Sequence, residues 1–115
     1  MTNKLILKYV NNSALKAMRD LPKEVGLQFA TDLQRVQNGK NPLSDFKHLT
    51  GMGSGVIELI ENGSPAYRVV YCAKHNDTLY VLHAFTKTTN GVDKAAMETV
   101  KGRIKLMMAD VRSNK

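Results

Sequence analysis

The sequence predicts an α+β domain with the element order β-α-α-β-β-β-α. It would contain a small, mainly antiparallel sheet, an N-terminal helical hairpin and a C-terminal helix, with the helices covering one face of the sheet. Two observations carry this prediction. Apolar residues recur at helical spacing in the first third of the chain and again near its carboxyl end. Between these segments, three runs rich in β-branched and aromatic residues are separated by turn-forming residues, as in a strand meander.

The first half predicts one strand followed by two helices. The run Leu5–Val10 is short and rich in strand formers, and residues 11–13 offer turn and helix-capping side chains. The apolar spacing that follows is interrupted by Pro22, which suits the first turn of a second helix. That helix is expected to end near Gly39, a residue that adopts left-handed backbone easily. Residues 40–55, punctuated by proline and glycines, are expected to form a loop.

The second half predicts three antiparallel strands. These are Val56–Glu61, Ala66–Cys72 and Thr78–Phe85. The dipeptide Asn62-Gly63 between the first two is a strong hairpin signal, and His75-Asn76-Asp77 is a second turn. Consecutive strands with such short connections form a meander.

A polar connection from Thr86 to Gly91 leads into a final helix that opens at Val92 or Asp93. One face of this helix is apolar and consists of Ala96, Val100, Ile104 and Met107. The other face is basic and consists of Lys94, Lys101, Arg103 and Lys105, with Arg112 and Lys115 beyond.

Composition indicates one globular domain, residues 1–115, with 43% hydrophobic and 23% charged residues. The single cysteine, Cys72, excludes an internal disulfide, and with three scattered histidines it does not predict a metal site. No apolar run reaches the ~20 residues of a membrane span, so we expect a cytoplasmic protein without a membrane partner. A net charge of +7 favours polyanionic partners, nucleic acid among them.

Three residues stand out as candidates for chemistry. Arg68 lies in the middle of an apolar strand, where it is either a solvated charge on the sheet or a clamp for phosphate. His83, near the end of the third strand, suits proton transfer, although a partnered structural histidine is the commoner outcome there. Lys87 is either a phosphate-neutralising group or an ordinary loop lysine. His48 and His75 lie in predicted loops and are expected to be solvated.

Four motifs in this order resemble the RelE/HigB-like toxins of bacterial type II toxin–antitoxin systems, and most of all the phage-derived branch grouped with HigB. The motifs are Lys47-His48-Leu49-Thr50-Gly51, Gly55-Val56-Ile57-Glu58-Leu59, Tyr67-Arg68-Val69-Val70-Tyr71 and Leu82-His83-Ala84-Phe85-Thr86-Lys87. The resemblance extends from about residue 10 to 107 and implies a RelE-like fold.

The resemblance further implies a metal-independent endoribonuclease, without a cofactor, that cuts messenger RNA in the ribosomal decoding site and so inhibits translation. A helix-turn-helix antitoxin would silence it. For cleavage of RNA by its own 2′-hydroxyl, we assign Arg68 and Lys87 to stabilising the phosphate charge and His83 to proton transfer. The residues expected to bind nucleic acid are Lys47, Lys74, Lys101 and Arg103.

The chain departs from the family pattern, because Ile60 stands where an arginine is usual and Thr88 where a second lysine is usual. A tyrosine that some members carry near the C-terminus also has no counterpart, since the last tyrosine is Tyr80. Two other functions therefore stay open. One is a ParE-like inhibitor of DNA gyrase, which shares the fold without cutting RNA. The other is a degenerate, non-catalytic toxin that only binds its antitoxin.

Overall fold

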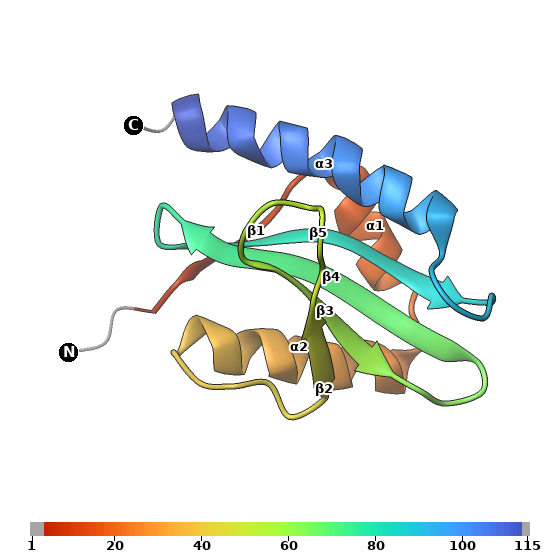
Figure 1. The fold of residues 1–115 in the computed structure, drawn as a ribbon. Coiled ribbons are helices and arrows are strands. Elements are labelled where there is room, and N and C mark those ends of the chain that lie inside the picture. The colour runs from red at the N-terminus through yellow and green to blue at the C-terminus, as the bar shows by residue number, and fades with distance from the viewer. Residues whose placement is uncertain (1–3, 114–115) are drawn as a thin grey trace.

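The computed structural model describes residues 4–113 and confirms the mixed α+β fold (Figure 1). The elements are β1 (Ile6–Tyr9), α1 (Asn12–Arg19), α2 (Lys23–Gln37), β2 (Asp45–His48), β3 (Val56–Glu61), β4 (Ala66–His75), β5 (Thr78–Lys87) and α3 (Lys94–Ser113). The observed order matches the predicted one apart from one additional strand, β2. The strands form a single sheet in the order β1-β5-β4-β3-β2. β1 runs parallel to β5, and every other neighbouring pair is antiparallel.

Helices cover both faces of the sheet, so the expectation of one covered face is wrong. Figure 1 shows α3 on one side of the sheet and α2 on the other. We call these sides the α3 face and the α1/α2 face. The reason lies in the two central strands, because Val69–Cys72 of β4 and Leu79–Leu82 of β5 are buried at every position. A strand that is apolar at every position must be covered on both faces.

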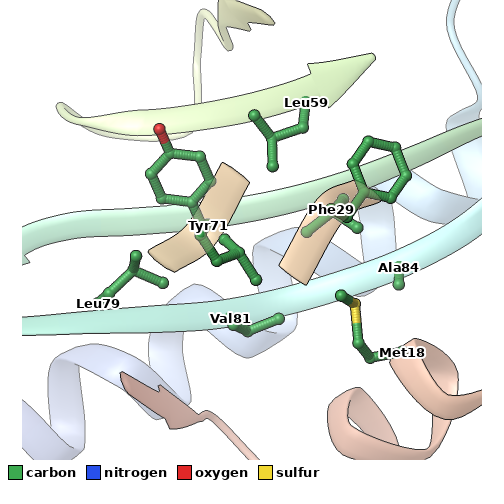
Figure 2. Packing of buried hydrophobic residues seen from close by; sticks show 9 residues of the cluster. Met18, Phe29, Leu59, Tyr71, Leu79, Val81 and Ala84 are labelled. Atoms are coloured by element: carbon green, nitrogen blue, oxygen red, sulfur yellow. The ribbon is translucent and has the colours of Figure 1, made fainter. Parts of the chain in front are cut away.

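Two apolar clusters follow from this arrangement. On the α1/α2 face, Met18 of α1 and Phe29 of α2 pack against β-strand residues that include Leu59, Tyr71 and Val81 (Figure 2). The cluster on the α3 face joins strand residues to the long C-terminal helix. Its buried members are Met52, Val56, Val70, Cys72, Tyr80, Leu82, Val100, Met107 and Val111. Ile104, expected on the buried side of α3, packs at the edge of this cluster.

The two hairpin turns differ from each other. Asn76 and Asp77 form a tight connection between β4 and β5, both with left-handed backbone, at φ values of 54° and 50°. The hairpin expected at Asn62-Gly63 is present, but its connection spans residues 62–65 and includes a cis Ser64–Pro65 peptide bond. Gly63 is not left-handed there. The tighter of the two turns is therefore the one without glycine.

The segment expected to be a loop, residues 40–55, contains β2, which pairs with the edge of β3. A buried carboxylate fixes its position. Asp32 of α2, 1% exposed, accepts hydrogen bonds from the backbone N of Leu43 at 2.8 Å and of Ser44 at 3.1 Å. It also accepts from the Ser44 hydroxyl, which in turn accepts from Gln28. We call this group the Asp32 clamp. It fastens the chain to α2 immediately before β2 begins.

Replacing Asp32 with alanine should lower the free energy of unfolding by roughly 2–4 kcal/mol. The substitution leaves two partly buried backbone N–H groups, those of Leu43 and Ser44, without their charged acceptor. Urea denaturation measures the change. The matched control is Asp45→Ala, an exposed carboxylate in β2 itself, which should shift stability by less than about 0.5 kcal/mol. Equal urea midpoints for the two variants would contradict the clamp.

Candidate functional site

A hollow of about 510 Å³ opens on the α3 face, between the β2–β3 segment, the end of β5 and the first turns of α3. We call it the β2–α3 hollow. Its lining residues are Lys47, His48, Leu49, Thr50, Gly51, Met52, Glu58, Phe85, Lys87, Gly91, Val92, Asp93, Lys94, Met97, Glu98 and Lys101. Because β5 leads through a short connection into α3, the strand end and the helix start lie at the same end of the molecule (Figure 1).

Lysines outnumber carboxylates in this hollow. The lysines are Lys47, Lys87, Lys94 and Lys101, and the carboxylates are Glu58, Asp93 and Glu98. Each carboxylate is already engaged. Glu58 lies 3.6 Å from the Lys47 ammonium, Glu98 lies 3.5 Å from that of Lys101, and Asp93 caps α3 by accepting from the Ala96 backbone N.

Two lysines of the hollow have no carboxylate partner. The Lys87 ammonium donates to the backbone O of Thr89 at 2.7 Å. The Lys94 ammonium makes no hydrogen bond or ion pair with any residue between 4 and 113. It opens the long helix α3, whose amino end carries a partial positive charge. An anion entering the hollow therefore meets two available ammonium groups beside a helix terminus.

Arg68 lies on the same face but beneath the hollow. Its side chain is only 9% exposed. Nη1 donates to the backbone O of Glu61 and of Tyr67, at 3.2 and 2.9 Å, and Nη2 donates to Asn62 Oδ1 at 3.0 Å. The Nε atom lies 3.6 Å from Glu58, too far for a hydrogen bond, and it is buried without an acceptor. One donor of this guanidinium is thus unused.

Glu58 connects Arg68 to the hollow. Its carboxylate, on β3, is 5% exposed and stands between Arg68 and Lys47, the residue paired with Glu58 across β2 and β3. A buried carboxylate is tolerated because two cations face it. It also screens Arg68 from anything that enters the hollow. Arg68, which was predicted to hold phosphate, therefore lies close to the hollow but is separated from it by the Glu58 carboxylate.

His83 is half-buried and neutral at pH 7. Burial, and after it the charge of Arg103, lowers the pKa of His83 to about 4, and the charge of Asp93 opposes this shift. Arg103 Nη1 lies 3.0 Å from His83 Nδ1. Because a guanidinium can only donate, Nδ1 accepts and the imidazole proton sits on Nε2. The ring stacks on Phe85 with centroids 5.1 Å apart.

Arg103 was expected to contact nucleic acid, but the structure directs it inward. It donates to His83 and, at 3.0 Å, to the backbone O of Leu82. The register between β4 and β5 shifts at Leu82, since Val70 pairs with His83 while Tyr71 pairs with Val81. Such a bulge leaves ladder groups unpaired, and the arginine satisfies one of them. Burial lowers the pKa of Arg103.

The remaining predicted residues divide into two groups. Lys47, Lys87 and Lys101 line the hollow. Lys74 does not line it, and its ammonium contacts the Ser54 hydroxyl instead. Lys115 of the basic helix face lies outside the described residues.

Two lining residues with basic side chains, His48 and Lys94, were not among the predicted site residues. His48 was expected to be a solvated loop residue; it is exposed, but it forms the end of β2 and lines the hollow. Lys94 was recognised only as part of a basic helix face. The position of Lys94 at the start of that helix, next to the strand carrying Lys87, was the signal that could have marked it.

Within residues 4–113, no three His, Cys, Asp or Glu side chains are grouped so that they could hold a metal ion. None of the helices in that range is both long and apolar enough to cross a membrane.

Residues 16–105 match the family described as phage-derived protein Gp49-like (DUF891). No curated protein matches the chain. Among solved structures, the chain is similar to one from the crystal structure of the toxin–antitoxin complex RelBE2 of Mycobacterium tuberculosis. The TM-score is 0.52 and the sequence identity is 14%, over 77% of this chain and 98% of that one.

At this identity the structural likeness establishes the fold, while the sequence match over most of the chain establishes the family. The chain therefore has a RelE-like fold and belongs to the phage-derived Gp49-like family, a family of RelE/HigB-type toxins.

Proposed function

We propose that this protein is the toxin of a toxin–antitoxin pair and that it cuts messenger RNA on the ribosome, with the scissile phosphate in the β2–α3 hollow. The observation that carries the proposal is the pair of ammonium groups without carboxylate partners in the hollow, Lys87 at the end of β5 and Lys94 at the amino end of α3. Phosphate is the anion that such a site in an RNA-directed toxin would meet.

Cleavage needs no group beyond those of the chain and the RNA. The 2′-hydroxyl loses its proton and its oxygen bonds to the neighbouring phosphorus, the charge on the phosphorane oxygens must be stabilised, and the bond from phosphorus to the 5′-oxygen breaks as that oxygen gains a proton. Lys87 and Lys94 supply charge at the phosphate. Arg68 adds its unused Nε–H once a phosphate oxygen takes the place of Glu58 beside it. The ribosome would align the message, which reduces what the protein must contribute.

Proton transfer is better suited to His48 than to His83. In His83, Nδ1 is held by Arg103 and the pKa is about 4, so at neutral pH the ring has no free basic nitrogen. His48 is exposed within the hollow and is next in sequence to Lys47. An imidazole in that position can exchange protons with the reacting oxygens.

An antitoxin is the second proposed partner. The RelBE2 structure is a toxin–antitoxin complex, and the chain shares its fold with a component of that assembly. We propose that a helix-turn-helix antitoxin binds this protein and prevents RNA from entering the hollow. A small helix-turn-helix reading frame next to this gene would support that partner.

Lys87→Ala should reduce cleavage of a translated message by about 10²-fold, because one donor to the transition-state charge is lost. The assay is message cleavage in a purified translation system, with and without ribosomes. The control is Lys16→Ala, an ammonium on α1 whose side chain is 80% exposed, which should keep the wild-type rate.

Two outcomes of this assay would contradict the proposal. Efficient cutting of naked RNA would remove the ribosome from the mechanism. Inhibition of gyrase supercoiling without any RNA cleavage would identify a ParE-like inhibitor instead.

Arg68 requires a paired design, since Arg68→Ala leaves Glu58 buried with one cation fewer and should cost about 3–5 kcal/mol of stability. The double variant Arg68→Met/Glu58→Gln removes both charges. Its free energy of unfolding should lie within about 1 kcal/mol of the wild-type value. We expect its cleavage rate to stay about 10²-fold low, because the Nε–H donor is missing. A double variant that folds and cuts at the wild-type rate would show that Arg68 is purely structural.

His83 should make the protein less stable in mild acid. Its pKa is near 6.5 in the unfolded chain and about 4 in the folded protein, so the unfolded state binds the proton first. The stability from the neutral ring is complete above pH 6.5 and is lost as the pH falls towards 4. Urea midpoints at pH 7, 5.5 and 4.5 should fall more steeply for wild type than for His83→Gln. The exposed His48→Gln should keep the wild-type slope.

A further inference from the structure

Strand β5 presents three different side chains in a row on the α3 face. His83 pairs with Val70 and Phe85 pairs with Arg68, so both point to the face that carries the hollow, and Lys87 follows at the strand end. Alternate residues on a strand lie about 6.6 Å apart. The row therefore places the imidazole of His83, the phenyl ring of Phe85 and the ammonium group of Lys87 along one line that ends in the hollow.

Phe85 is a residue of this row that has no role in the proposed phosphate chemistry. One side of its ring is covered by the stacked imidazole of His83, at an interplanar angle of 22°. The ring also lines the β2–α3 hollow, so surface that His83 does not cover is turned to that space. Because His83 is held neutral, it supports the ring by flat stacking without adding a charge beneath it.

Apolar side chains continue this surface across the hollow. Val92 and Met97 line it from the α3 side, and Leu49 and Met52 line it from the β2–β3 segment. Val92 is 70% exposed, so its side chain is accessible to a ligand in the hollow. A site for phosphate alone needs no such wall. The hollow thus has an aromatic and aliphatic part next to its ammonium groups.

We propose that the β2–α3 hollow binds one unstacked RNA nucleotide, with its base lying on Phe85 and its phosphate on Lys87. The inference rests on the proposed function, because it names the part of the message that occupies the same hollow. A ring and a basic group side by side are how proteins hold single-stranded RNA, since every base has a planar face. The site reads the presence of a base and not its identity.

The test compares two ligands that differ only in the base, adenosine 5′-monophosphate and ribose 5-phosphate. Binding to the full chain is followed by NMR titration at low salt. The nucleotide should bind about tenfold more tightly than the sugar phosphate, and the Phe85 ring protons should shift upfield with the nucleotide alone. Phe85→Leu should abolish the preference. The matched control is Phe46→Leu, an exposed ring of β2 outside the hollow lining, which should preserve it.

Equal affinities for the two ligands in wild type, or unshifted Phe85 resonances, would overturn the base subsite. Neither result depends on whether the variants fold. Translation-dependent cleavage measured on the same preparations separates the two proposals. Cleavage without a base preference removes the subsite and leaves the proposed function standing. A tenfold preference without cleavage supports the subsite and overturns the proposed RNA cleavage.

Discussion

The antiparallel ladder between β4 and β5 is the constraint on which the rest of the structure depends. These are the two longest strands, and they are buried on both faces where they cross the centre of the molecule. Their double burial requires one helical layer on each side. It also fixes which residues face the hollow, because alternate side chains of one strand share a face. Arg68, Phe85 and Lys87 are neighbours for this reason, although they come from different strands.

The second constraint on the structure is the pairing of carboxylates with cations in the hollow. A chain with a net charge of +7 would be expected to expose a uniformly basic site, yet each carboxylate in the hollow engages a lysine, an arginine or the start of α3. These pairs hold long side chains in place and reduce the repulsion between neighbouring ammonium groups. They also mean that a bound phosphate must compete with Glu58 for the cations around it. The resting protein therefore contains its own anion at the centre of the basic cluster.

The sequence predicted the features that depend on local chemistry. Both hairpins, the interruption at Pro22 and the left-handed Gly39 appear at the predicted positions, although the turn at Asn62-Gly63 is longer than its dipeptide signal implies. Lys47, Lys87 and Lys101, which were expected to meet nucleic-acid phosphate because of their charge, all line the hollow. Each of these predictions needs only a few neighbouring residues.

The features that were missed depend on contacts between distant segments. β2 has four exposed side chains and no apolar alternation, and its position follows from a carboxylate in α2. The inward turn of Arg103 follows from a bulge in another strand. The position of α3 could have been predicted in part, because the continuous apolar runs in β4 and β5 require a helical layer on each face of the sheet. The burial of Arg68 could not be foreseen, since it depends on Glu58, which pairs with Val70 and reaches Arg68 diagonally from the next strand.

The Asp32 clamp has a consequence for which mutations would inactivate such a gene. The clamp lies in α2, on the face away from the hollow, yet it anchors the strand that carries Lys47 and His48. Cells that survive forced production of a harmful protein are enriched for changes that disable it. Among such survivors, lesions in α2 would accompany those around the lysines. They would inactivate the protein by displacing one wall of the hollow, while every charged residue of the hollow is unchanged.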